Sequence, residues 1–116
     1  ELFPRLEERL TQTAETLSGG ERQMLAMARA LMPNPDVLFI DEPSAGLSPQ
    51  LIERTFDHIE KIRKSGTAVL MIEQDVNAAL SVADRGYVLE MGENRFEGDA
   101  VSIRESKQIR DLYLGR

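Results

Sequence analysis

Two short segments of the sequence carry residue types suited to phosphate chemistry. The first is Leu17-Ser18-Gly19-Gly20-Glu21, directly before a predicted helix. Two glycines let a backbone approach a ligand closely, and a helix start offers free N–H groups and a positive dipole end to an anion. These residues therefore suit a phosphate-binding helix start to which the Ser18 hydroxyl adds a donor. A loop with an ordinary serine cap would account for the same residues, and that alternative stays open.

The second segment is a pair of carboxylates, Asp41 and Glu42, at the end of an apolar run over residues 37–40. Ligands of α/β sheets bind beyond the carboxyl ends of the strands. Asp41 could hold Mg²⁺, directly or through water, and Glu42 could orient and polarise an attacking water. A strand that merely leaves the core for solvent would also explain two acidic residues there.

Strands and helices that could position these segments alternate along the chain. Apolar periodicity predicts a helix over residues 21–32 with a buried face, and Ser48-Pro49 predicts the start of a second helix that Gly66 stops. Two apolar runs, residues 37–40 and 67–72, predict strands buried on both faces, as in a parallel sheet.

The C-terminal third continues this alternation. Asp75 is predicted to cap a third helix, and residues 87–96 predict a hairpin around a glycine turn. A last amphipathic stretch carries four apolar residues: Ile103, Ile109, Leu112 and Leu114. The sequence therefore predicts an α/β domain with a parallel sheet.

Composition narrows the possible functions. The 116 residues suffice for one domain or part of one, and the chain opens on Glu1 rather than Met, so we expect a fragment. Absence of cysteine excludes disulfides and thiolate metal sites, and we assign the lone histidine, His58, no role. A net charge of −6 argues against a nucleic-acid surface. The sequence carries no signal peptide, and its apolar runs are too short to cross a bilayer, so any link to a membrane is expected through a partner.

In their order and spacing these segments resemble the ABC ATPase family. Residues 17–21 resemble its signature motif, residues 37–42 its Walker B strand with the catalytic glutamate, and residues 44–48 its D-loop. Gln74 stands at the switch position, and the resemblance runs from about Phe3 to the C-terminus. It implies an α/β fold that is a partial P-loop NTPase (ABC ATPase) core with parallel strands, part of the helical subdomain and a C-terminal β-hairpin.

The resemblance also implies how the chain is organised. Residues 1–116 would be the C-terminal part of one ABC ATPase domain, with residues 1–34 the end of the helical subdomain and residues 35–116 the Walker B, D-loop, switch and C-terminal elements. No G-x-x-x-x-G-K-[ST] loop occurs in the sequence, so we expect the chain alone to be inactive. Without the strand that carries that loop, the strand over residues 68–72 should expose an unpaired apolar edge.

The family's site residues carry over to matching positions. Glu42 and Gln74 would be catalytic, and Asp41 would serve Mg²⁺. ATP held by a second subunit would be capped in trans by the signature residues Ser18, Gly19, Gly20 and Glu21. The D-loop, which couples the two sites of the dimer, would be Ser44, Ala45, Gly46, Leu47 and Ser48.

Two departures from the family pattern point to a subfamily. Gln74 replaces the usual histidine and cannot carry its proton or charge, while Ser48 replaces the usual D-loop aspartate. Together they resemble the ATP-binding subunits of branched-chain amino acid importers. The resemblance implies an ATP-hydrolysing subunit that energises import of a small solute, with branched-chain amino acids favoured.

Its partners would be a second ABC ATPase subunit, as a homo- or heterodimer, and membrane permease subunits, without nucleic acid. The subunit would then be cytoplasmic and peripheral on the inner face of the cell membrane. Two alternatives stay open: an ABC ATPase outside transport, and a non-enzymatic half-domain that caps a partner's nucleotide. A pure cap would have no use for Glu42.

Overall fold

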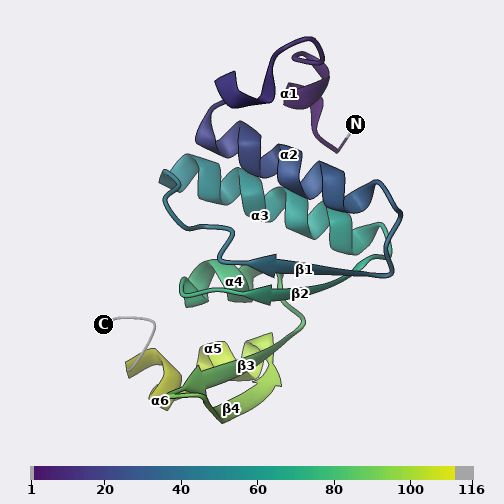
Figure 1. Ribbon diagram of the computed structural model, residues 1–116. Coiled ribbons are helices and arrows are strands. Elements are labelled where there is room, and N and C mark those ends of the chain that lie inside the picture. The colour runs from purple at the N-terminus through teal and green to yellow at the C-terminus, as the bar shows by residue number, and fades with distance from the viewer. Residues whose placement is uncertain (1, 112–116) are drawn as a thin grey trace. The chain divides into compact units, whose positions relative to one another are not determined.

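The chain divides after β2 into two units, Glu1–Glu73 and Gln74–Arg116 (Figure 1). The computed structural model describes residues 2–111, so the predicted apolar positions Leu112 and Leu114 lie outside the described residues. Within residues 2–111, no helix is both long enough and apolar enough to span a membrane.

The first unit holds two strands, three α-helices and one 3₁₀ turn. In chain order these are α1 (Pro4–Glu7), η1 (Ala14–Thr16), α2 (Gly19–Leu31), β1 (Val37–Asp41), α3 (Pro49–Lys64) and β2 (Ala68–Ile72). The predicted helix over residues 21–32 thus begins two residues earlier, at the glycines themselves. Pro49 starts α3 with its φ already set for a helix, and Gly66, at φ 104, ends it. Ser48 is the N-cap residue, but its side chain makes no capping hydrogen bond.

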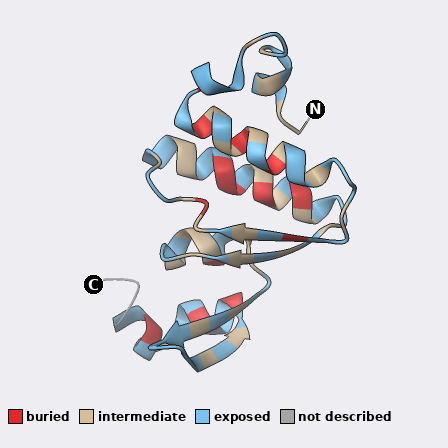
Figure 2. Cartoon of the chain, in the orientation of Figure 1, coloured by how far each residue is buried: buried red, intermediate tan, exposed pale blue. Residues whose placement is uncertain are grey.

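β1 and β2 pair in parallel, and helices α3 and α2 stack over one face of this sheet (Figure 1). The register runs from Val37 opposite Ala68 to Asp41 opposite Ile72. Buried residues, red in Figure 2, lie on the two stacked helices and on β1: Met24, Met27, Leu38, Phe56, Ile59 and Ile62. The end of β1 and the starts of α2 and α3 consequently lie at the same end of this unit (Figure 1).

The expectation of strands buried on both faces is wrong for this chain. Along β1 and β2, every second side chain faces α3, and the side chains between them face away from it. Of those that face away, Phe39 is 73% exposed, Leu70 53% and Ile72 61%. Among the described residues β2 pairs only with β1, as expected for a strand whose other neighbour is not in the chain. The run of apolar residues therefore marks a face that the described residues of the first unit leave uncovered.

Over its described residues, 74–111, the second unit is a hairpin packed with three short helices. It contains α4 (Val76–Val82), β3 (Arg85–Glu90), β4 (Glu93–Asp99), α5 (Ala100–Glu105) and α6 (Lys107–Ile109). The predicted glycine turn is confirmed, since the two residues between the strands, Met91 and Gly92, both have positive φ. Its core is formed by Leu80, Ala100, Ile103 and Ile109, so the predicted amphipathic stretch is buried where it is described. A parallel pair, its covering helices and a C-terminal hairpin confirm the predicted fold class.

The open sheet face generates a prediction about association. We expect the isolated chain to self-associate, because removing this apolar surface from water is favourable. Phe39 and Leu70 are cross-strand partners, so Phe39→Lys together with Leu70→Glu places opposite charges side by side. Light scattering on a sizing column should show a mass that rises with concentration for the wild type and stays monomeric for the double variant.

Met91→Lys is the matched control, because Met91 is 94% exposed but lies on the hairpin turn. It should associate as the wild type does. A wild-type chain that remains monomeric and melts in one sharp transition would contradict the prediction.

Candidate functional site

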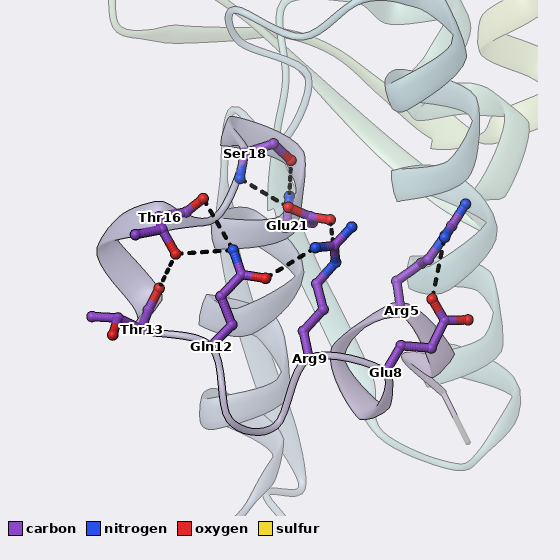
Figure 3. A network of polar contacts seen from close by, with 8 residues as sticks. All are labelled: Arg5, Glu8, Arg9, Gln12, Thr13, Thr16, Ser18 and Glu21. Carbon is purple, nitrogen blue, oxygen red and sulfur yellow. Dashed lines mark hydrogen bonds and ion pairs between the residues drawn. The ribbon is translucent and has the colours of Figure 1, made fainter.

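The predicted phosphate-binding helix start is a capping box at the N-terminus of α2 (Figure 3). Ser18 Oγ accepts a hydrogen bond from the Glu21 N–H at 3.3 Å, and Glu21 Oε2 accepts one from the Ser18 N–H at 2.9 Å. Both side chains thus satisfy backbone donors that a helix start leaves unpaired. The serine-cap alternative is therefore correct as local structure, and it is compatible with an anion at the remaining N–H groups of Gly19 and Gly20.

The segment before α2 holds this box in place (Figure 3). Arg9 Nε forms an ion pair with Glu21 Oε1 at 2.9 Å, and Arg9 Nη1 donates to Gln12 Oε1 at 2.9 Å. Gln12 Nε2 in turn donates to Thr16 Oγ1 at 2.9 Å. Hydrogen bonds from Ser18, and second the charge of Arg9, hold the pKa of Glu21 below its ordinary value of 4.5. Sequence reasoning missed Arg9 and Gln12, since nothing in their spacing marks them.

Positions 19 and 20 are occupied by glycine for different structural reasons. Gly20 is buried, and a Cβ there would lie 2.9 Å from Leu51 Cδ2, so its small size lets the start of α2 pack against α3. Gly19 is exposed, and a Cβ there would meet nothing within 4 Å. Packing among the described residues therefore explains why residue 20 is a glycine. It does not explain the glycine at position 19, and the close approach of a ligand is the remaining reason there.

The carboxylates lie at the end of β1. Asp41 is its last residue and is exposed, while Glu42 is half-buried and has φ 43, an uncommon value for a residue with a side chain. The Glu42 N–H donates to the Ile72 carbonyl at 2.9 Å, which continues the pairing with β2 one residue past the strand. The backbone thus reverses at Glu42 while it remains tied to the neighbouring strand.

The turn that follows Glu42 is anchored by two side chains from other elements. Glu73 accepts two hydrogen bonds from Ser44: its Oε1 from the backbone N–H at 2.7 Å and its Oε2 from the hydroxyl at 2.9 Å. Gln23 of α2 donates from Nε2 to the Pro43 carbonyl. Sequence reasoning missed Gln23 and Glu73 as site residues, although Gln23 lies in the helix predicted over residues 21–32 and Glu73 directly precedes Gln74.

The predicted D-loop is held in a turn by its own backbone hydrogen bonds. Ala45 N–H donates to the Glu42 carbonyl at 3.0 Å, and Leu47 N–H donates to the Ser44 carbonyl at 3.2 Å. Gly46 has φ 71, which a side chain would strain. The structure thus brings the D-loop, Glu42 and the end of β2 together. Gln74 is exposed and begins the second unit, before α4.

These residues fit the ligands that the sequence implies. Mg²⁺ is usually held by one or two carboxylates together with substrate phosphates, and Asp41 offers one exposed carboxylate. Residues 2–111 contain no cluster of three metal-binding side chains, so a metal at Asp41 would need ligands from the nucleotide or another segment.

Comparison with known proteins shows which proteins the chain is similar to. A sequence profile described as "ABC transporter" matches residues 2–45. An ATP-binding cassette of an ABC transporter in its ADP conformation superposes with a TM-score of 0.77, at 30% identity, over 90% of this chain and 43% of that one. The chain is similar to ATP-binding cassettes of ABC transporters over 90% of its length. The dimeric post-hydrolysis state of another cassette, bound to ADP and Pi, superposes with a TM-score of 0.63 at 31% identity, over 74% of this chain and 37% of that one.

The curated relatives include two proteins named for branched-chain amino acid transport and one named for lipopolysaccharide export. The chain is 50% identical to the high-affinity branched-chain amino acid transport ATP-binding protein BraG of Pseudomonas aeruginosa, over 99% of the chain and 49% of the relative. It is 44% identical to the probable branched-chain amino acid transport ATP-binding protein LivF of Archaeoglobus fulgidus, over 97% of the chain and 48% of the relative. The lipopolysaccharide export ATP-binding protein LptB of Escherichia coli is 36% identical over 87% of the chain and 42% of its own length. The chain thus spans about half the length of the curated relatives that it matches.

The two glycines should respond differently to alanine. Gly20→Ala is expected to have a free energy of unfolding about 1–3 kcal/mol below that of Gly19→Ala, because the Leu51 side chain must shift to accept the new methyl group. Gly19→Ala should leave stability unchanged or raise it by up to ~1 kcal/mol, because alanine favours the helix and has space. Urea unfolding of the two variants measures the difference, and equal effects would contradict the assignment of Gly20 to packing.

The capping box should make stability depend on pH. Because the pKa of Glu21 is lowered in the folded chain, its contribution is present above the ordinary pKa of 4.5 and is lost as pH falls through the folded value. Melting midpoints of the wild type and Glu21→Gln should therefore differ at pH 7 and converge toward about pH 3. Glu15→Gln removes the same charge at an exposed position and is the control. A Glu21→Gln difference that persists at low pH would contradict the role of this carboxylate.

Proposed function

We propose that the chain is the C-terminal part of an ATP-hydrolysing subunit that energises solute uptake through an ABC transporter. The observation that carries the proposal is the 50% identity to BraG over 99% of the chain, which includes the helix start at Ser18 and the carboxylates Asp41 and Glu42. Residues 1–34 would then end the helical subdomain, and residues 35–116 would supply the Walker B, D-loop, switch and C-terminal elements.

The geometry of the site supports a division of roles. Ser18, Gly19 and Gly20 present hydrogen-bond donors at the start of α2, which suits the phosphates of a nucleotide held by a second subunit. Glu21 would act through its capping bonds to Ser18. Asp41 would hold Mg²⁺, which when bound neutralises charge on the phosphates. Glu42 would orient and deprotonate the attacking water, and Gln74 would hydrogen-bond a phosphate oxygen or that water.

In the family that the chain resembles, such a site forms between two subunits, and this chain would supply signature donors to one nucleotide and carboxylates to another. The chain has no G-x-x-x-x-G-K-[ST] loop, so that loop would come from an N-terminal half. The partners would be a second ABC ATPase subunit, homo- or heterodimeric, and membrane permease subunits that keep the protein on the inner face of the cell membrane. The dimeric cassette bound to ADP and Pi supports the first of these partners.

For the solute we propose branched-chain amino acids and import. Identity to the branched-chain amino acid proteins is 50% and 44%, against 36% to the lipopolysaccharide export protein. Gln74 and Ser48, the two departures from the family pattern, support the same subfamily. The two alternatives remain as outcomes of the test.

The test uses a hybrid subunit, in which the N-terminal half of the Pseudomonas aeruginosa relative precedes this chain. We expect no ATP turnover from the chain alone and steady-state turnover from the hybrid subunit. Glu42→Gln should lower the kcat of the hybrid by about 10²- to 10⁴-fold, the range for loss of a general base, with KM for ATP little changed. Glu53→Gln, an exposed position on α3, is the matched control.

Different results separate the alternatives. Nucleotide-dependent dimerisation of the hybrid without turnover would favour a non-enzymatic cap. Turnover stimulated by ribosomes or DNA rather than by permease would favour an ATPase outside transport. Turnover by the chain alone would overturn the account of the site.

A further inference from the structure

We propose that Glu73 is a positioning residue that holds the turn after β1, and with it Glu42, against the end of β2. This proposal rests on the proposed ATPase function. It assigns a role to a carboxylate that takes no part in the chemistry itself. The observation is the double hydrogen bond from Ser44 to Glu73, at 2.7 Å from the N–H and 2.9 Å from the hydroxyl.

The turn needs such an anchor because Glu42 lies in the left-handed region. A residue with a side chain at φ 43 persists only where the surrounding contacts hold it. One contact is the Glu42 N–H bond to the Ile72 carbonyl, which fixes the start of the turn. Glu73 fixes the turn two residues later, and both atoms of its carboxylate are used.

Charge makes this anchor stronger than an ordinary turn contact. A carboxylate that accepts from an N–H and an O–H forms charge-assisted bonds, and both partners are only partly exposed. Since Glu73 directly follows Ile72, the last residue of β2 and the residue after it hold both ends of the Glu42–Ser44 turn. Loss of the carboxylate should therefore let the turn relax at Ser44 while the pairing of β1 with β2 stays intact.

A small displacement of a catalytic base is costly, because an attacking water must be aligned within a fraction of an ångström. We thus expect Glu73→Ala in the hybrid subunit to lower kcat by about 10- to 100-fold with KM for ATP unchanged. Ser44→Ala, which removes only the hydroxyl bond, should have a smaller effect in the same direction, and Ser44→Thr should restore activity because it keeps a hydroxyl. Glu73→Gln can still accept from the Ser44 N–H and should retain most of the activity.

Two readouts distinguish positioning from a general loss of structure. In a Glu42→Gln background, Glu73→Ala should cause no further loss of the residual rate, because the group that it positions is already gone. The exchange rate of the Ser44 amide, followed by NMR, should rise in Glu73→Ala, while the Ala68 amide, which bonds to the Asp36 carbonyl at the other end of the sheet, should not change. Ser65→Ala removes a serine hydroxyl bond at the end of α3 and is the matched control.

The outcomes separate this inference from the proposed function. Unchanged kcat in Glu73→Ala, in a hybrid whose turnover requires Glu42, would overturn the positioning role and leave the ATPase standing. A raised KM together with a lowered melting midpoint would also overturn it, in favour of a structural role. A hybrid without turnover would overturn the proposed function and the positioning role that rests on it, whatever the amide exchange shows.

Discussion

The first unit depends on a reversal of the chain at Glu42, where a residue with a side chain adopts φ 43 directly after a strand. Such a conformation costs on the order of 1–3 kcal/mol and needs support from its surroundings. β2 supports it through the Ile72 carbonyl and Glu73, and α2 supports it through Gln23, which reaches the Pro43 carbonyl. The parallel register, the helix that carries the signature residues and the D-loop all meet at this one bend.

Local signals predicted most of the fold. Pro49 at the start of α3, Gly66 beyond its end and Gly92 in the hairpin turn restrict the backbone within a few residues, so the sequence indicates them directly. The open sheet face was not predicted, because Val37 to Ile40 is an unbroken apolar run in which neither face is distinguished. Which face is covered depends on the elements that pack there, and α3 covers only one.

For the candidate site as well, the sequence predicted some of the residues and missed others. Ser18, Asp41 and Glu42 were predicted because their chemistry is tied to a helix start or a strand end that the sequence shows. Arg9, Gln23 and Glu73 were missed, because each acts on a residue of another segment. Gln23 and Pro43 are 20 positions apart, and Ser44 and Glu73 are 29 apart. Such contacts exist only once the sheet register and the stacking of α2 on α3 are fixed.

The polarity of the capping box has a consequence for which ions the start of α2 can accept. Ser18 Oγ accepts its bond from the Glu21 N–H, so its hydroxyl keeps its one donor. Glu21, the nearest negative group, has both oxygens turned toward Ser18 and Arg9. What this end of α2 presents to its surroundings is therefore mainly hydrogen-bond donors, among them the N–H groups of Gly19 and Gly20. Such a surface favours the oxygens of an anion over a cation.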